Sequence, residues 1–89
     1  MKRIETLKIH GKRWFQKSYG NTYHTVTVIV NGKEMKSGIT YGYGNHYLQT
    51  AADMLRNAGY DIPDNNGDAY AMMTKYEYDV EDVKRKKDL

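Results

Sequence analysis

The sequence contains no cysteine, a single proline and no long hydrophobic run. Without cysteine, the chain can form neither a disulfide framework nor a thiolate metal site, and it has no thiol nucleophile. No segment approaches the roughly 20 apolar residues that a membrane-spanning helix requires. Charged residues interrupt every apolar stretch of residues 1–8, which is unlike a signal peptide. We therefore expect a cytoplasmic protein that makes no contact with a membrane.

The length and charge of the chain limit it further. Its 89 residues fit one domain with a modest core. Hydrophobic residues make up 39% and charged residues 28%, which is typical of a globular rather than a disordered chain. The net charge of +3 permits an anionic partner without requiring one. It argues against an acidic protein that mimics DNA.

Tyrosine is the residue type that is clearly enriched. The chain has nine tyrosines but only one phenylalanine and one tryptophan. Tyrosine is favoured where a ring lies against a surface while its hydroxyl stays hydrated. We expect about half of these tyrosines to lie at the edge of the core and the others to belong to a binding surface, since such surfaces are often rich in Tyr, Ser, Gly and Asn.

Two extended segments dominate the first half of the sequence. Residues 7–17 form the first, with a break near Gly11, and residues 18–21 have the composition of a turn. Residues 23–30 alternate regularly and predict the clearest strand. The predicted faces of this strand are His24, Val26, Val28 and Val30 on one side, and Tyr23, Thr25, Thr27 and Ile29 on the other.

The Asn-Gly pair at residues 31–32 predicts a type I′ turn into a third strand that ends at residue 41 or 43. A two-residue loop would place His24 opposite Ile39. A bulge at residues 37–38 would shift this far half of the register. The buried face is predicted to contain Val26, Val28, Met35 and Ile39.

A helix and a last strand complete the predicted domain. An apolar stripe predicts a helix over residues 45–58, with Asn45 as its N-cap and Gly59 just past its end. Residues 61–68 have the composition of a loop, and residues 72–80 alternate as a strand.

These segments predict a small α+β single domain over residues 1–80. Its order is β-β-β-α-β, with an antiparallel sheet, one helix packed on one face and the other face open. Residues 81–89 are predicted to form a charged, flexible tail. An unpaired sheet edge would allow a homodimer.

The junction over residues 39–47 is the most informative stretch for function. Gly42 and Gly44 lie between a strand and a helix, where unpaired backbone N–H groups and the helix dipole favour an anion. His24 is expected beside this helix start through the hairpin register. The alternative is a simple tight connection, because the third glycine and the parallel unit of a dinucleotide site are absent.

The three histidines show no metal-ligand spacing, so we expect no metal site. His24 and His46 could form the acid–base pair of a metal-independent ribonuclease, assisted by a lysine or a tyrosine. Histidines in such positions more often cap a sheet end or contact a partner. No nucleophile elbow, P-loop or kinase motif is present. We therefore expect no catalytic residue, no cofactor and no enzymatic activity.

Basic residues form two clusters, at residues 12–17 and residues 84–87. Together with exposed aromatic rings, they could hold a phosphate backbone and stack bases. The alternative is a solvated terminal run, since the acidic residues at 77–82 dilute the basic charge just before it.

Several motifs resemble those of a group of short phage and prophage proteins. They are Trp14-Phe15, the Gly-Asn-Thr-Tyr-His stretch at residues 20–24, and the segment from Tyr41-Gly42-Tyr43-Gly44 to Ala51, and they span roughly the first two-thirds of the chain. The resemblance carries no established activity. It implies a small accessory product that works in the host bacterial cytoplasm by binding.

The sequence therefore predicts a phage-type accessory protein that binds a macromolecule, most of all a host or phage protein, and inhibits a host defence system. The alternative is a nucleic-acid or nucleotide binding module that uses the glycine-flanked helix start. A metal-independent ribonuclease is the third hypothesis. The predicted binding residues are Trp14, Tyr19, Asn21, Tyr23, His24, Tyr41, Gly42, Tyr43, Gly44, Asn45 and His46.

Overall fold

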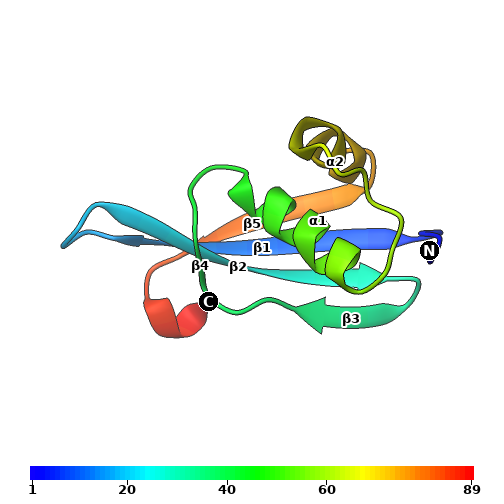
Figure 1. Cartoon of the computed structure of the whole chain (residues 1–89). Coiled ribbons are helices and arrows are strands. Elements are labelled where there is room, and N and C mark those ends of the chain that lie inside the picture. The colour runs from blue at the N-terminus through cyan, green and yellow to red at the C-terminus, as the bar shows by residue number, and fades with distance from the viewer.

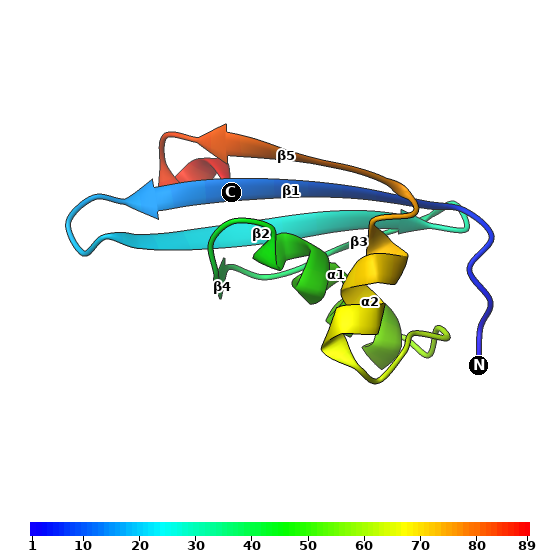
Figure 2. The ribbon, with the colours of Figure 1, turned by 90° about the horizontal axis from the view of Figure 1, so that it is seen from above.

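A long antiparallel hairpin of two strands, β1 (Leu7–Gln16) and β2 (Asn21–Val30), forms the centre of the fold (Figure 1). The computed structural model describes all residues from 1 to 89. The two strands pair over their full length. Seen from above, the turn that joins them projects beyond the helices (Figure 2). The hairpin therefore has one end that is covered by helices and one end that is not.

A short return arm follows β2 and pairs along it. It consists of β3 (Lys33–Lys36) and β4 (Thr40–Tyr41). The φ angles of Asn31 and Gly32 are 50° and 82°, so the predicted type I′ turn is confirmed.

The register shift that a bulge at residues 37–38 would cause is present between β3 and β4. His24 lies opposite Thr40 rather than Ile39, which is a shift of one position. At the shift, the hydroxyl of Ser37 accepts a hydrogen bond of 2.9 Å from the amide of Val26, where a strand carbonyl would normally accept it. As a result Ile39 is exposed, and its predicted place in the core is wrong.

The sheet is mixed rather than antiparallel, which corrects a second prediction. Its strand order is β3-β2-β1-β5, with β4 also on β2, and β5 (Glu77–Val83) runs parallel to β1. Parallel neighbours need a crossover connection. The two helices supply it, because they return the chain to the end of the sheet where β1 begins (Figure 1).

A second helix, α2 (Asn66–Met73), takes the place of part of the predicted loop and the start of the predicted last strand. The side chain of Asn65 caps it by accepting a hydrogen bond of 3.1 Å from the amide of Asp68. The helix buries Ala69 and Met73, which lie one turn apart on one face. The α+β class and the single domain are confirmed, with two helices instead of one.

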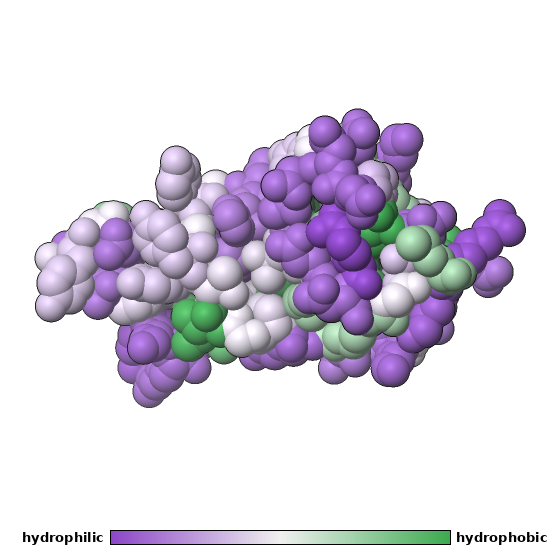
Figure 3. Space-filling model, viewed as in Figure 1, coloured by the Kyte–Doolittle hydropathy of each residue, from purple (hydrophilic) through white to green (hydrophobic).

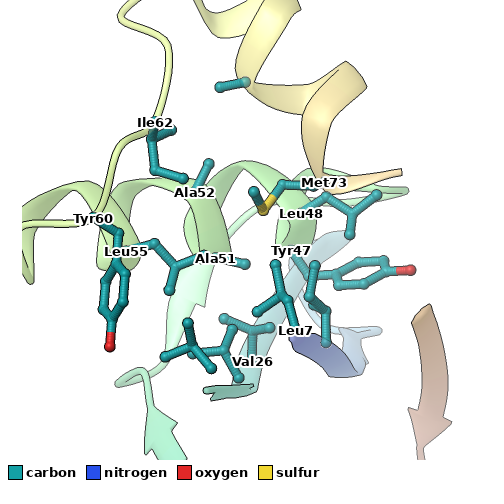
Figure 4. Close-up of a cluster of buried hydrophobic side chains, with 14 residues drawn as sticks. Leu7, Val26, Tyr47, Leu48, Ala51, Ala52, Leu55, Tyr60, Ile62 and Met73 are labelled. Carbon is teal, nitrogen blue, oxygen red and sulfur yellow. The ribbon is translucent and has the colours of Figure 1, made fainter. Parts of the chain in front are cut away.

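The core lies between α1 (His46–Asn57), α2 and the covered face of the sheet (Figure 4). The predicted helical stripe is confirmed, since α1 buries Tyr47, Leu48, Ala51, Ala52 and Leu55. The sheet contributes Leu7, Ile9, Val26, Val28 and Val30. Gly59 follows α1 with a φ of 92°, as predicted for the residue past a helix end.

Strand β1 continues through Gly11 without the predicted break. The ring of Tyr47 packs directly on this glycine, and a Cβ there would lie only 2.6 Å from Cδ2 of Tyr47. Gly11 is therefore required by the packing of a buried ring rather than by a bend in the chain.

The face of the sheet opposite the helices is partly occupied by the C-terminal residues (Figure 1). Strand β5 continues to Val83, and η1 (Lys86–Asp88) is a 3₁₀ helix, so the fold includes residues that were predicted to form a tail. Lys36 Nζ lies 3.4 Å from the carbonyl oxygen of Leu89. Thr25, predicted on the open face, is buried. None of the helices is both long enough and apolar enough to span a membrane.

Candidate binding site

His24 organises the loop of residues 40–46, which is called the junction loop below. Its Nδ1 lies 3.1 Å from the carbonyl oxygen of Gly42, so this nitrogen carries the proton and donates. Its Nε2 lies 2.7 Å from Oγ1 of Thr50, whose hydroxyl then donates to the ring. Neutral His24 thus satisfies both ring nitrogens while linking β2 to the junction loop and to α1.

The environment of His24 favours this neutral form. The side chain is 0% exposed. Burial lowers its pKa below the ordinary value of 6.5; the hydrogen bond to Gly42 opposes this shift, and nearby His46 reinforces it. His24 is therefore a positioning residue beneath the loop, and it does not reach a partner. A substrate could not contact it either, which weighs against an acid–base pair with His46.

The ring of His46 explains why Gly42 is a glycine. Its centroid lies 5.4 Å from that of His24. A Cβ on Gly42 would lie 2.6 Å from Cγ of His46. The glycine makes room for an imidazole of its own chain, and not for a ligand as the anion-site hypothesis required.

Arg13 fixes the next turn of the junction loop. Its Nη1 donates a hydrogen bond of 2.9 Å to the carbonyl oxygen of Gly44. Its Nε and Nη2 donate to both carboxylate oxygens of Asp82, at 2.8 and 3.1 Å. Gly44 has a φ of 62°, a conformation that other residues rarely adopt. Arg13 therefore joins β1, β5 and the loop.

A third contact holds the end of the loop. Nδ2 of Asn45 donates a hydrogen bond of 3.1 Å to the hydroxyl of Tyr70 in α2. Asn45 precedes α1 as predicted, but its side chain makes no capping bond. The amide of His46 donates to the carbonyl of Tyr43 at 3.2 Å, so it is not directed at a bound anion. The loop is thus held from β1, β2, α1 and α2.

The side chains that the loop displays are exposed. Tyr41 is 56% exposed and Tyr43 is 73% exposed. Tyr19, at the hairpin turn, is 76% exposed, and Phe15 is also exposed. The space-filling view shows no broad hydrophobic patch on this face: pale and purple side chains cover the hairpin end, and green ones are scattered (Figure 3).

The open face of the sheet adds an aromatic row to this end. The rings of Trp14 and Tyr23 stack with centroids 6.0 Å apart, and Tyr41 meets Tyr23 edge-on at 5.7 Å. Asn21 lies beside this row at the start of β2 and is half-buried. We use the term hairpin-end surface for the exposed and half-buried aromatic residues Trp14, Phe15, Tyr19, Tyr23, Tyr41 and Tyr43.

A pocket of ≈ 360 Å³ lies between the junction loop and the helices. It is lined by Tyr41, Gly42, Tyr43, Asn45, His46, Gln49 and Tyr70. Gln49 and Tyr70 were not predicted as site residues, and neither were Arg13 and Thr50. The position of Arg13 could have been derived, since it lies opposite His24 in the hairpin register. Tyr70 could not, because α2 itself was not predicted.

The basic clusters are diluted by acidic neighbours. Lys12, Lys84, Arg85 and Lys87 line one groove together with Glu81, Asp82 and Asp88. Arg85 lies 3.6 Å from Asp88, and Arg13 of the first cluster is bound to Asp82. No group of three or more His, Asp or Glu side chains is arranged to hold a metal ion.

The sheet edges bear on the predicted homodimer. Strand β5 is one edge, and four of its seven residues are acidic. Charged edge residues oppose pairing with the same edge of a second copy. Dimerisation through a sheet edge therefore stays a prediction, and the acidic residues of β5 oppose it at this edge.

Comparison of the chain with protein-family models, with curated proteins and with solved structures finds no match in any of the three.

Proposed function

We propose that this protein is a small binding module that acts by stoichiometric binding to another protein through the hairpin-end surface. The observation that carries the proposal is the contrast within the junction loop. The side chains of His24 and Arg13 bind its backbone carbonyls and Tyr70 binds the side chain of Asn45, while its two tyrosines stay exposed.

A fixed loop with exposed tyrosines is suited to binding. Ordering side chains and loops on association costs free energy, and a loop that is already held avoids much of that cost. Tyrosine and tryptophan are enriched among the residues that contribute most to protein interfaces. Their rings offer a large contact area with few rotatable bonds.

The charge distribution favours a protein over a nucleic acid. Nucleic-acid affinity depends on several free cationic side chains that neutralise phosphates. Here Arg13 is paired with Asp82, and the C-terminal basic residues share their groove with three acidic side chains. From the sequence resemblance alone we further propose that the partner is a bacterial host protein and that binding inhibits a defence system.

The experiment is a pull-down from bacterial lysate, compared with and without nuclease treatment. The test variant is Tyr41→Ala/Tyr43→Ala, and the matched control is Tyr78→Ala, which removes an exposed tyrosine from β5. We expect wild type and the control to retain one protein, with or without nuclease, and the test variant to lose it. The purified complex should have a fixed molar ratio. Retention that requires nucleic acid, or that survives the double substitution, would contradict the proposal.

A further inference from the structure

The pocket between the junction loop and α2 has a composition that differs from the rest of the surface. Tyr41, Tyr43, Tyr70 and His46 are among the residues that line it. No lysine, arginine or carboxylate lines it. Its volume of ≈ 360 Å³ lies in the range of roughly 300–1,000 Å³ that is common for small-molecule sites. A ring-shaped ligand without charge at the point of contact fits these walls.

The two amide side chains of the pocket are oriented by bonds to the protein. Nδ2 of Asn45 donates to the Tyr70 hydroxyl at 3.1 Å. Nε2 of Gln49 donates to Oδ1 of Asp53 at 3.3 Å and to Oδ1 of Asn66 at 3.2 Å. Gln49 uses both hydrogens of its NH₂ group in this way, so its carbonyl oxygen is left for a ligand. Asn45 uses one of its two amide hydrogens and also keeps its carbonyl oxygen available. These oxygens accept hydrogen bonds, so the ligand must donate them.

A cation would also donate, but the surroundings disfavour it. The pocket lies at the start of α1, where the helix dipole is positive. The Arg13 guanidinium is bound to Gly44, next to the pocket residues Tyr43 and Asn45. A neutral hydrogen-bond donor on a flat ring suits the uncharged walls, the acceptor oxygens and the positive surroundings of the pocket. The exocyclic amine of a nucleobase is such a group.

We propose that this pocket binds a nucleobase that carries an exocyclic amine, such as cytosine or adenine. The base packs against the tyrosine rings, as bases do on aromatic platforms, and its amine donates to the carbonyl oxygens of Gln49 and Asn45. The base can belong to a free nucleotide or to single-stranded nucleic acid. The pocket differs from the proposed protein interface because it includes Gln49 and Tyr70. Tyr41 and Tyr43 belong to both.

Cytidine and uridine monophosphate provide the sharpest test, because they differ mainly in an amine against a carbonyl oxygen. Titration followed by amide NMR shifts of residues 40–48 should give at least about fivefold tighter binding for the cytidine nucleotide, since a correct base contact is worth about 1–3 kcal/mol. Adenosine monophosphate should also bind. Gln49→Leu should remove the preference, and Tyr70→Leu should weaken both nucleotides. Thermal melting establishes that each variant folds.

Short cytidine and uridine homopolymers, titrated in parallel, identify the source of the base. Binding of the monophosphate assigns a nucleotide, and binding of the cytidine polymer alone assigns a single strand. Equal affinity for cytidine and uridine forms, or no shift with any probe at millimolar base, would overturn the proposal. Gln49→Leu should leave the protein pull-down unchanged, so the two proposals fail separately.

Discussion

The two ends of the β1–β2 hairpin have the same backbone pairing and opposite surroundings. At the end where β1 begins, Leu7 and Ile9 pair with Val30 and Val28, and all four are buried beneath the helices. At the other end, Trp14 pairs with Tyr23 and Phe15 with Thr22, and none of them is fully buried. The difference lies in what covers the strands.

This contrast separates stability from binding. Burying an aliphatic side chain contributes roughly 1.5–3 kcal/mol, and an exposed ring contributes little. The covered end therefore supplies most of the stability, and the hairpin end is free to present aromatic side chains. His24 and Arg13, which face each other in the register, stand between the two ends and hold the junction loop.

A charge placed at the covered end of the hairpin should have the largest effect on stability. Val28→Asp puts a carboxylate without a partner in the core and should lower the free energy of unfolding by more than about 4 kcal/mol. A small domain has only about 5–15 kcal/mol to lose. Urea unfolding followed by circular dichroism measures the change. Thr27→Asp, one residue earlier and on the other face, should cost less than about 1 kcal/mol. Equal losses would mean that the two faces are not distinct.

The contact between Gly11 and Tyr47 offers a smaller, more local test. Gly11→Ala should destabilise by about 1–3 kcal/mol, because its Cβ meets the Tyr47 ring. Gly38→Ala is the matched control, since nothing lies within 4 Å of its added Cβ. If the collision is the cause, Gly11→Ala combined with Tyr47→Leu should cost less than the two single changes together. Additive losses would point to a backbone effect at Gly11 instead.

The free energy of unfolding should depend on pH through His24, which lies between the two ends of the hairpin. Burial lowers the pKa of His24 in the folded state, so the unfolded chain binds the proton more readily. The contribution of neutral His24 is therefore complete above about pH 6.5 and is lost as the pH falls below that value, by at most about 1.4 kcal/mol per pH unit.

The matched variant for the pH test is His24→Gln, whose amide can still donate to Gly42 and accept from Thr50 but does not titrate. Urea unfolding at a series of pH values between 7 and 5 should show a smaller loss of stability for this variant than for wild type. Identical pH profiles would remove His24 as the source of the dependence.

The sequence predicts the local elements of the fold well. The valine alternation of β2, the Asn31-Gly32 turn, the interruption at residues 37–38 and the stripe of α1 are all confirmed, because each depends on short-range chemistry. Helix α2 was missed because its short sequence follows a polar loop, and the residues after it alternate. Without α2, the parallel return of β5 could not be predicted.

The sequence predicts the location of the candidate site better than the roles of its residues. The hairpin register placed His24 beside the strand–helix junction, and the structure places it there. Its complete burial depends on the helices above it, which no local pattern reveals. The contact of Gly42 with the His46 ring, and the bonds from Arg13 and Tyr70, join distant segments and could not be derived from spacing.

Tyr43→Ala should have the smallest effect on stability, and it tests most directly the contrast between exposed and buried rings. Tyr43 and Tyr47 are four residues apart, yet Tyr43 is 73% exposed and Tyr47 is 2% exposed. Tyr47→Ala should cost about 3–5 kcal/mol, because it empties the space above Gly11. Tyr43→Ala should change the free energy of unfolding by less than about 0.5 kcal/mol, because its ring loses no core contact and the backbone bonds of the loop remain.

Urea unfolding of both variants measures the two changes. A loss of more than about 1 kcal/mol at Tyr43 would show that its ring supports the fold, and the loss of partner binding in its variants could then no longer be assigned to a missing contact. A change near zero would leave the exposed ring without a structural role and strengthen its assignment to binding.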